Sequence, residues 1–340
     1  MRSKAAFSDS SRKEHDHSHD AHGHIHGVVD PSIFTTQKGI HAVKWSFLWL
    51  SATALFQVVI VLISGSVALL ADTVHNIGDA FTAIPLWIAF TLVRRGPSRQ
   101  YTYGYGRVED LAGVVIVFTI LTSAVIAGYQ SIDRLLHPRA MEYLPMVAIA
   151  SIIGFAGNEA VALFRLRVGK EIGSAALVAD GHHARVDGLT SLAVLLGVAG
   201  AWLGYPMADP IVGLVITAVI LHIVWTSGRE VFKRLLDGVD PEIIEEIRHA
   251  VDNVQGVEDI TDVRVRWIGH RLNAEVSIAV NPEYTIEQGH EIALEVRHQL
   301  LHHLKYLSHV SIHVDPANAA GERHHSIDNH SHDDISSHSH

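Results

Sequence analysis

Long apolar stretches fill the first two thirds of the chain. Between about residues 45 and 226, runs of hydrophobic residues almost free of charge alternate with short polar connections. A helix needs ~20 consecutive apolar residues to cross the hydrocarbon core of a bilayer. We therefore predict six membrane helices, at residues 45–65, 67–93, 111–129, 143–164, 174–203 and 208–227.

The pattern changes from Pro241 onward. The stretch PEIIEEIRHAVDNV and residues 285–304 have the spacing of amphipathic helices. TDVRVRWIG, RLNAEVSIAV and HVSIHVD alternate as half-buried strands do, and Gly269-His270 links the first two. The order α-β-β-α-β predicts a small two-layer α+β domain of ferredoxin-like type.

Together these patterns predict an α-helical membrane protein with six transmembrane helices followed by a cytoplasmic α+β ferredoxin-like domain. The predicted divisions are a disordered His-rich tail at 1–43, a transmembrane domain at 44–236, the ferredoxin-like domain at 237–316 and a second disordered His-rich tail at 317–340.

Basic residues in the connections predict the orientation, because cytoplasmic loops carry an excess of Lys and Arg. The connections on one side hold about ten such residues: Arg94, Arg95, Arg99, Arg107, Arg165, Arg167, Lys170, Arg229, Lys233 and Arg234. The connections on the other side hold Arg134 and Arg139. We therefore expect both termini in the cytoplasm, and a plasma (inner) membrane as the location.

The second and fifth predicted helices contain an internal repeat. Residues 68–82 (ALLADTVHNIGDAFT) and 176–190 (ALVADGHHARVDGLT) agree at seven of fifteen positions. Apolar similarity alone would not align three ionisable residues, and here they align as pairs: Asp72 with Asp180, His75 with His183, and Asp79 with Asp187.

The spacing of the repeat points to metal binding. Positions i, i+3 and i+7 lie on one face of a helix, and a carboxylate in a bilayer core costs at least ~2.5 kcal/mol. If the two faces meet, four side chains can form a tetrahedral site for a zinc-type dication: His75, Asp79, His183 and Asp187. The simpler reading is a set of polar pairs that only holds the two helices together.

Asp72 and Asp180 lie about one turn before the histidines. They could be ligands, neighbours that hydrogen-bond to a histidine and orient it, or residues that line a water-filled entry path. His182 points about 100° away from His183 and is not expected to be a ligand, and Arg185 should face elsewhere.

Composition excludes some functions. The formal net charge of -10 argues against a nucleic-acid partner, and the lack of cysteine removes thiolate metal sites. Histidine is abundant, with 26 residues, and many lie in the tails. The tails could be solubilising or metal-collecting, and the candidate metal-collecting residues are His15, His17, His19, His22, His24 and His26.

These motifs resemble the cation diffusion facilitator family over about residues 44–316. The resemblance rests on the paired HxxxD segments, on YTYGYGRVEDLAG, on ADPIVG and on VSIHVDP. It implies a dimeric, proton-coupled exporter of zinc and related dications, with six membrane helices, cytoplasmic termini and a ferredoxin-like cytoplasmic domain.

The resemblance also implies roles for residues outside the repeat. Arg107 and Asp209 stand where some relatives form a charge interlock, although Asp209 could simply be a helix N-cap. His290, His313 and Asp315 match metal-binding positions of the cytoplasmic domain in some members, although His290 could be an ordinary exposed residue. Asp262 and Glu275 stand where some relatives carry histidine.

The predicted function is therefore secondary transport, and the protein is not expected to be an enzyme. The substrate is a divalent cation, Zn²⁺ by ligand type, although the same ligands also admit Cd²⁺, Co²⁺, Fe²⁺, Mn²⁺ or Ni²⁺. Protons, the lipid bilayer and a second copy of the chain are the expected partners, and no permanent cofactor is expected. The alternatives are a membrane-anchored metal sensor or buffer, or a membrane metalloenzyme.

Overall fold

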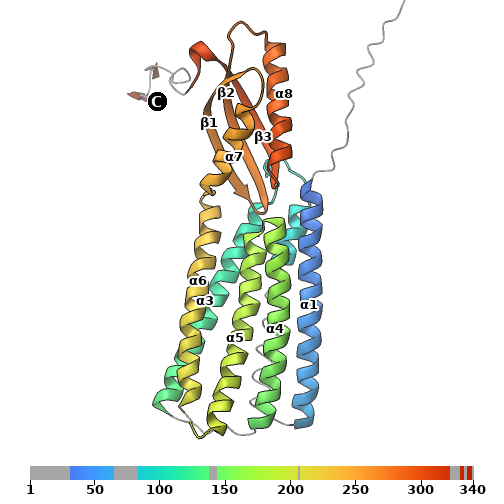
Figure 1. Cartoon of the computed structure of the whole chain (residues 1–340), viewed down its shortest axis with the longest axis vertical. Helices are drawn as coiled ribbons and strands as arrows, with labels where there is room; N and C mark the ends of the chain where they lie inside the picture. The colour runs from blue at the N-terminus through green and yellow to red at the C-terminus, as the bar shows by residue number, and fades with distance from the viewer. Residues whose placement is uncertain are drawn as a thin grey trace, which may run out of the picture.

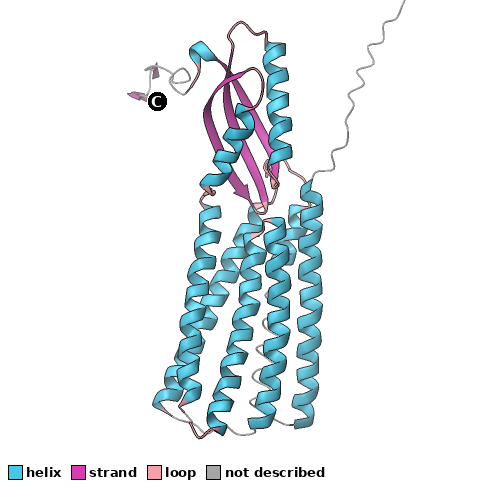
Figure 2. Cartoon of the chain, in the orientation of Figure 1, coloured by secondary structure: helices cyan, strands magenta, loops and turns pink. Residues whose placement is uncertain are grey.

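The protein consists of a long bundle of helices with a small α+β domain at one end (Figure 1). The computed structural model describes residues 31–64, 83–137, 144–205, 207–321, 330–332 and 335–338. All strands of the soluble domain lie beyond one end of the bundle, whose described elements are helices (Figure 2).

The bundle is built from long helices that run along its axis. They are α1 (Pro31–Ser64), α3 (Arg107–Leu136), α4 (Leu144–Ile172), α5 (Ala175–Trp202) and α6 (Ala208–Leu235), with a shorter helical segment, Ala83–Val93. In the described part of the chain, α3, α4, α5 and α6 are long and apolar enough to span a membrane. Residues 65–82 lie outside the described residues, so the count of six remains a prediction.

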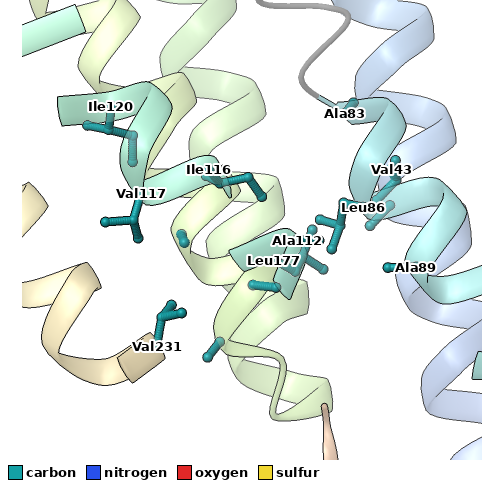
Figure 3. Packing of buried hydrophobic residues seen from close by; sticks show 14 of the residues in the cluster. Val43, Ala83, Leu86, Ala89, Ala112, Ile116, Val117, Ile120, Leu177 and Val231 are labelled. Atoms are coloured by element: carbon teal, nitrogen blue, oxygen red, sulfur yellow. The ribbon is translucent and has the colours of Figure 1, made fainter. Parts of the chain in front are cut away.

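Among the described helices of the bundle, α5 is the most enclosed. It packs against α3, α4 and α6, and α1 packs on the outer side of α4. Small and branched apolar side chains from α1, α3, α5, α6 and the 83–93 segment fill the interior (Figure 3), and the labelled members are Val43, Ala83, Leu86, Ala89, Ala112, Ile116, Val117, Ile120, Leu177 and Val231.

The outer surface of the bundle is also apolar. Exposed large hydrophobic side chains recur along α3 and α6: Leu111, Val115, Phe118, Val125, Ile126, Tyr129 and Ile132 on α3, and Ile211, Val215, Val219, Leu221 and Trp225 on α6. Soluble proteins rarely expose contiguous apolar surfaces of this extent. The surface therefore fits a bundle surrounded by lipid, as expected for a multi-pass membrane protein.

The N-terminal boundary differs from the predicted one. We expected a disordered tail up to residue 43, but α1 already begins at Pro31, and Ile40, Ala42 and Val43 are buried. Proline is favoured in the first turn of a helix. The extension is held by tertiary contacts, because a Cβ at Gly39 would lie 2.7 Å from the Phe90 ring. The local pattern of this segment is too polar to reveal such packing.

The soluble domain has the predicted order of elements. It comprises α7 (Pro241–Asp252), β1 (Val257–Ile268), β2 (Arg271–Val280), α8 (Ile286–His303) and β3 (Leu307–Pro316). The sheet order is β1-β2-β3, with β2 antiparallel to β1 and parallel to β3. Both helices contribute to one apolar core with the sheet. A reciprocal capping box between Thr285 and Gln288 begins α8.

The C-terminal tail also differs in part from the expectation of disorder. After β3 come a short 3₁₀ turn, Ala317–Ala319, and two short antiparallel strands, β4 (His330–His332) and β5 (Ile335–His338). The sequences of the two strands, HSH and ISSH, are short and hold one apolar residue, so they lack the alternation that signals a strand.

Candidate metal centre

The α5 helix presents one half of the predicted transport site. His183 and Asp187 are buried, and His183 Nε2 lies 3.9 Å from Asp187 Oδ2. They are four residues apart on a continuous helix, so both side chains lie on one face, as predicted. The other half, His75 and Asp79, and also Asp72, lies outside the described residues. The four-ligand site therefore remains a prediction.

Close packing of α4 against α5 buries this half-site. A Cβ added at Gly169 would lie 2.9 Å from the backbone nitrogen of Val178, and one at Gly181 would lie 2.9 Å from that of Leu166. Small residues allow two membrane helices to approach closely. The two glycines therefore set the helix separation just to the soluble-domain side of His183.

At this crossing Asp180 forms an ion pair with an arginine that the sequence placed in a loop. Arg165 is in fact inside α4, where its side chain is 1% exposed, and Asp180 is 0% exposed. Arg165 Nη1 lies 3.2 Å from Asp180 Oδ2. Apolar length alone ended the fourth predicted helix at residue 164, because a charged residue normally marks the end of a span.

A second ion pair joins the same two helices on a more exposed side. Arg185 Nε donates to Glu159 Oε2 at 3.2 Å, and its Nη2 donates to Oε1 at 2.7 Å. This forked pair accounts for Arg185, which faces away from the ligands as expected. His182 is half-buried, and the positive charge of Arg185 acts on its imidazole ring.

The cytoplasmic-domain candidates are only partly brought together. His313 Nε2 lies 2.9 Å from Asp315 Oδ1, so the predicted pairing of i and i+2 on β3 holds. His290 is exposed near the beginning of α8. Among the described residues of one chain, no three metal-ligating side chains gather in a cluster, so His290 does not complete a site there. Asp262 pairs instead with Arg264, and Glu275 with Arg266.

The predicted interlock between Arg107 and Asp209 is wrong. Arg107 begins α3 beside the soluble domain, whereas Asp209 begins α6 at the opposite end of the bundle (Figure 1). Arg107 Nη2 donates to Asp237, in the link between α6 and the soluble domain. Asp209 accepts from Arg134 Nη1 at 2.7 Å. The sequence does not distinguish the two possible partners of Arg107, because Asp209 lies at the beginning of α6 and Asp237 just after its end.

A buried polar network at the junction of the two domains was not predicted. His270, in the turn between β1 and β2, donates from Nδ1 to Glu109 Oε2 at 2.6 Å, and both side chains are 1% exposed. Ser174 donates to the other carboxylate oxygen of Glu109 at 2.6 Å. Thr36 Oγ1 lies 3.0 Å from His270 Nε2. We refer to Thr36, Glu109, Ser174 and His270 as the junction network.

The turn itself is shaped for this docking. Gly269 has φ of +63°, and a Cβ there would lie 2.8 Å from the carbonyl oxygen of Gly106. Its backbone N–H donates to Asp110 Oδ2 at 3.2 Å. The Gly269-His270 pair, which the sequence identified only as a connection, is therefore the point at which the soluble domain enters the bundle.

The histidines of the N-terminal tail, from His15 to His26, lie outside the described residues. Their predicted role in collecting metal is therefore still a prediction.

Both domains match families of known proteins. Residues 43–236 match the model of a cation efflux transmembrane domain, and residues 239–317 match that of the cytoplasmic domain of a cation efflux protein. A "Probable cation efflux system protein" of Mycobacterium tuberculosis (strain H37Rv) is 54% identical over 301 residues, 88% of this chain and 90% of that protein.

More distant relatives extend the same comparison. The magnetosome protein MamB of Magnetospirillum gryphiswaldense is 25% identical over 82% of this chain and 94% of its own length. A solved cadmium form of the MamM CTD is 28% identical, covers 22% of this chain and 94% of that chain, and has a TM-score of 0.22.

Proposed function

The chain belongs to the cation diffusion facilitator family of cation efflux transporters, and on that premise we propose that it exports zinc from the cytoplasm in exchange for protons. The family consists of divalent-metal transporters rather than enzymes, which removes the metalloenzyme alternative. The proposal concerns the metal, the coupling ion, the ligands and the direction of transport.

The observation that carries the proposal is the buried pair of His183 and Asp187 on one face of α5. We propose that His75 and Asp79 supply the matching pair from the second helix, which gives two imidazoles and two carboxylates. Zinc favours such tetrahedral nitrogen and oxygen sites. Cadmium, cobalt, iron, manganese and nickel are the competing substrates that the same ligands admit.

Proton exchange follows from the ligand chemistry. A histidine has an unperturbed pKa near 6.5, and metal binding requires neutral imidazole and ionised carboxylate. Protons and metal therefore compete for the same atoms. A proton gradient can thus favour metal at the site on the side with fewer protons, and protons at the site on the opposite side.

The direction of transport rests on the charge of the two ends. Exposed basic residues cluster at the soluble-domain end of the bundle: Arg94, Arg95, Arg99, Arg167 and Lys170. At the other end Arg134 is paired with Asp209. The excess of positive charge supports a cytoplasmic soluble domain and cytoplasmic termini, in a plasma (inner) membrane.

The soluble domain belongs to a family of dimerisation domains, and we propose a homodimer assembled through it. His313 and Asp315 would then form a secondary metal site completed by His290 of either chain, while the His-rich tails collect metal near the membrane. An assembled pair binds such a metal better than separated chains do, so metal would draw the two domains together.

The proposal is tested by measuring metal flux into proteoliposomes that contain the full chain. Zinc, cadmium, cobalt, nickel, iron and manganese are compared, each with and without a pH gradient. We expect zinc to be preferred and its flux to depend on the gradient. Zinc binding without flux would instead favour a membrane-anchored sensor or buffer.

A matched pair of variants tests the site itself. His183→Ala should abolish zinc flux, because it removes a ligand, whereas His182→Ala should retain most of it. Both proteins should remain folded and inserted, as checked by size-exclusion chromatography. Normal flux in His183→Ala would show that the transport site lies elsewhere.

A further inference from the structure

Arg165 is a buried cation that has no role in the transport cycle proposed above. Its side chain is among the largest fully buried ones of the described residues. It lies seven residues before the end of α4, at the crossing with α5. A charge is kept at such a position only when it has a partner or a function, because burying it without one is costly.

The partner of Arg165 lies directly beside the proposed site. Asp180 is three residues before His183, which corresponds to about 4.5 Å along a helix axis. The soluble-domain end of α5 is at Ala175, so Asp180 lies between that end and the ligands. An ion entering from the soluble-domain side must therefore pass the level of the Arg165–Asp180 pair.

The pair is poorly built as a structural bridge. Its side chains make one ion contact, Nη1 to Oδ2 at 3.2 Å, and Nη1 also makes a long hydrogen bond to the Asp180 carbonyl oxygen at 3.5 Å. Among the described residues, Nε and Nη2 of Arg165 and both carboxylate oxygens of Asp180 have no hydrogen-bond partner. The Arg185–Glu159 pair, on the same two helices, is forked and makes two hydrogen bonds. Arg–carboxylate pairs are frequently forked in this way, and the Arg165–Asp180 pair lacks that geometry.

We propose that Arg165 is the counter-cation of the empty transport site: it neutralises Asp180 when no metal is bound, and an incoming dication displaces it. Arg165 then acts as a positioning residue rather than a ligand. This inference rests on the proposed function, since it requires metal at His183 and Asp187.

Physical competition explains why such a residue would help transport. A buried carboxylate requires a cation in every state of the cycle. A tethered arginine supplies one after the metal has left, and its incomplete set of hydrogen bonds allows the next ion to displace it. Arg165 thereby limits the affinity for metal and favours release, so it should influence both KM and the maximal rate.

The test compares Arg165→Met with Arg167→Met in the full chain reconstituted in proteoliposomes, with zinc as the probe. Arg167 is exposed two residues further along α4 and serves as a charge-matched control. Arg165→Met should lower KM for zinc by about fivefold or more, the usual scale of coupling between sites, and should also lower the maximal rate. Arg167→Met should change neither.

A purely structural role predicts a different pattern, namely loss of active protein without tighter KM. An unchanged KM in Arg165→Met, with His183→Ala inactive, would overturn this inference and leave the proposed function intact. An active His183→Ala would instead overturn the proposed function.

If Arg165→Met does not fold, Asp180→Asn and the double variant Arg165→Met/Asp180→Asn decide the question. Asp180→Asn leaves the arginine charge uncompensated near the site and should raise KM. The double variant removes that charge and should restore KM toward the wild-type value. Equal KM values in Asp180→Asn and the double variant would contradict the proposal.

Discussion

The junction network and the crossing of α4 with α5 are both buried and ionic, yet they are satisfied to different degrees. In the junction network both carboxylate oxygens of Glu109 accept a hydrogen bond, and both ring nitrogens of His270 have a partner. At the crossing, Arg165 and Asp180 share one ion contact between their side chains, and four of their buried polar atoms have no hydrogen bond among the described residues.

The difference separates a joint from a site that exchanges ions. A fully satisfied buried network resists change, because moving any member exposes an unpaired group to an apolar interior. A charge pair with few hydrogen bonds breaks fewer of them when a new cation displaces one partner. The junction therefore fixes the soluble domain on the bundle, and the crossing remains able to rearrange.

The largest expected effect comes from Glu109→Ala, which removes the centre of the junction network. It leaves the Nδ1 proton of His270 and the hydroxyl proton of Ser174 buried without an acceptor. The loss should cost about 3–5 kcal/mol, as broken buried ion pairs do. Thermal unfolding in detergent should show the loss, and the link between α6 and α7 should become sensitive to protease.

The control for this experiment is Glu171→Ala. Glu171, in the last turn of α4, pairs with Lys38 of α1 within the bundle, and that pair is exposed to solvent. It should leave thermal unfolding and protease sensitivity almost unchanged. If both variants behaved alike, burial would not be what distinguishes the junction network.

A smaller effect is expected from the double variant Arg165→Met/Asp180→Asn. Replacing a poorly satisfied buried ion pair by neutral groups of similar volume is often neutral or stabilising. We therefore expect its stability to lie within about 1 kcal/mol of the wild type, or above it. A loss of several kcal/mol, measured by thermal unfolding, would mean that the crossing is as well built as the junction.

The smallest effect should come from Asp237→Asn, which removes the negative charge opposite Arg107 and keeps a side chain that tolerates the left-handed backbone of this position, with φ of +60°. This ion pair is 37% and 48% exposed on its two side chains. Exposed pairs contribute about 0–1 kcal/mol, and Arg107 keeps its bond to the Arg234 carbonyl oxygen at 3.1 Å. A large drop in unfolding temperature would show that docking depends on this link rather than on His270.

Local patterns in the sequence determined much of this protein. The elements of the soluble domain follow from periodicity, because amphipathic helices and half-buried strands bury one face whatever their partners are. The pairing of His183 with Asp187 on one face follows from helix geometry alone. The matching residues His75 and Asp79 lie outside the described residues, so the facing half of the site rests on the repeat.

Tertiary structure decided the features that depend on which helix ends meet. Arg165 was read as a loop residue because charge usually ends a span, but the glycines of α4 and α5 bury it. Arg107 pairs with Asp237 rather than Asp209, and His270 pairs with Glu109, 161 positions away. Such long-range pairs leave no periodic trace, because each partner is chosen by packing rather than by its neighbours in the chain.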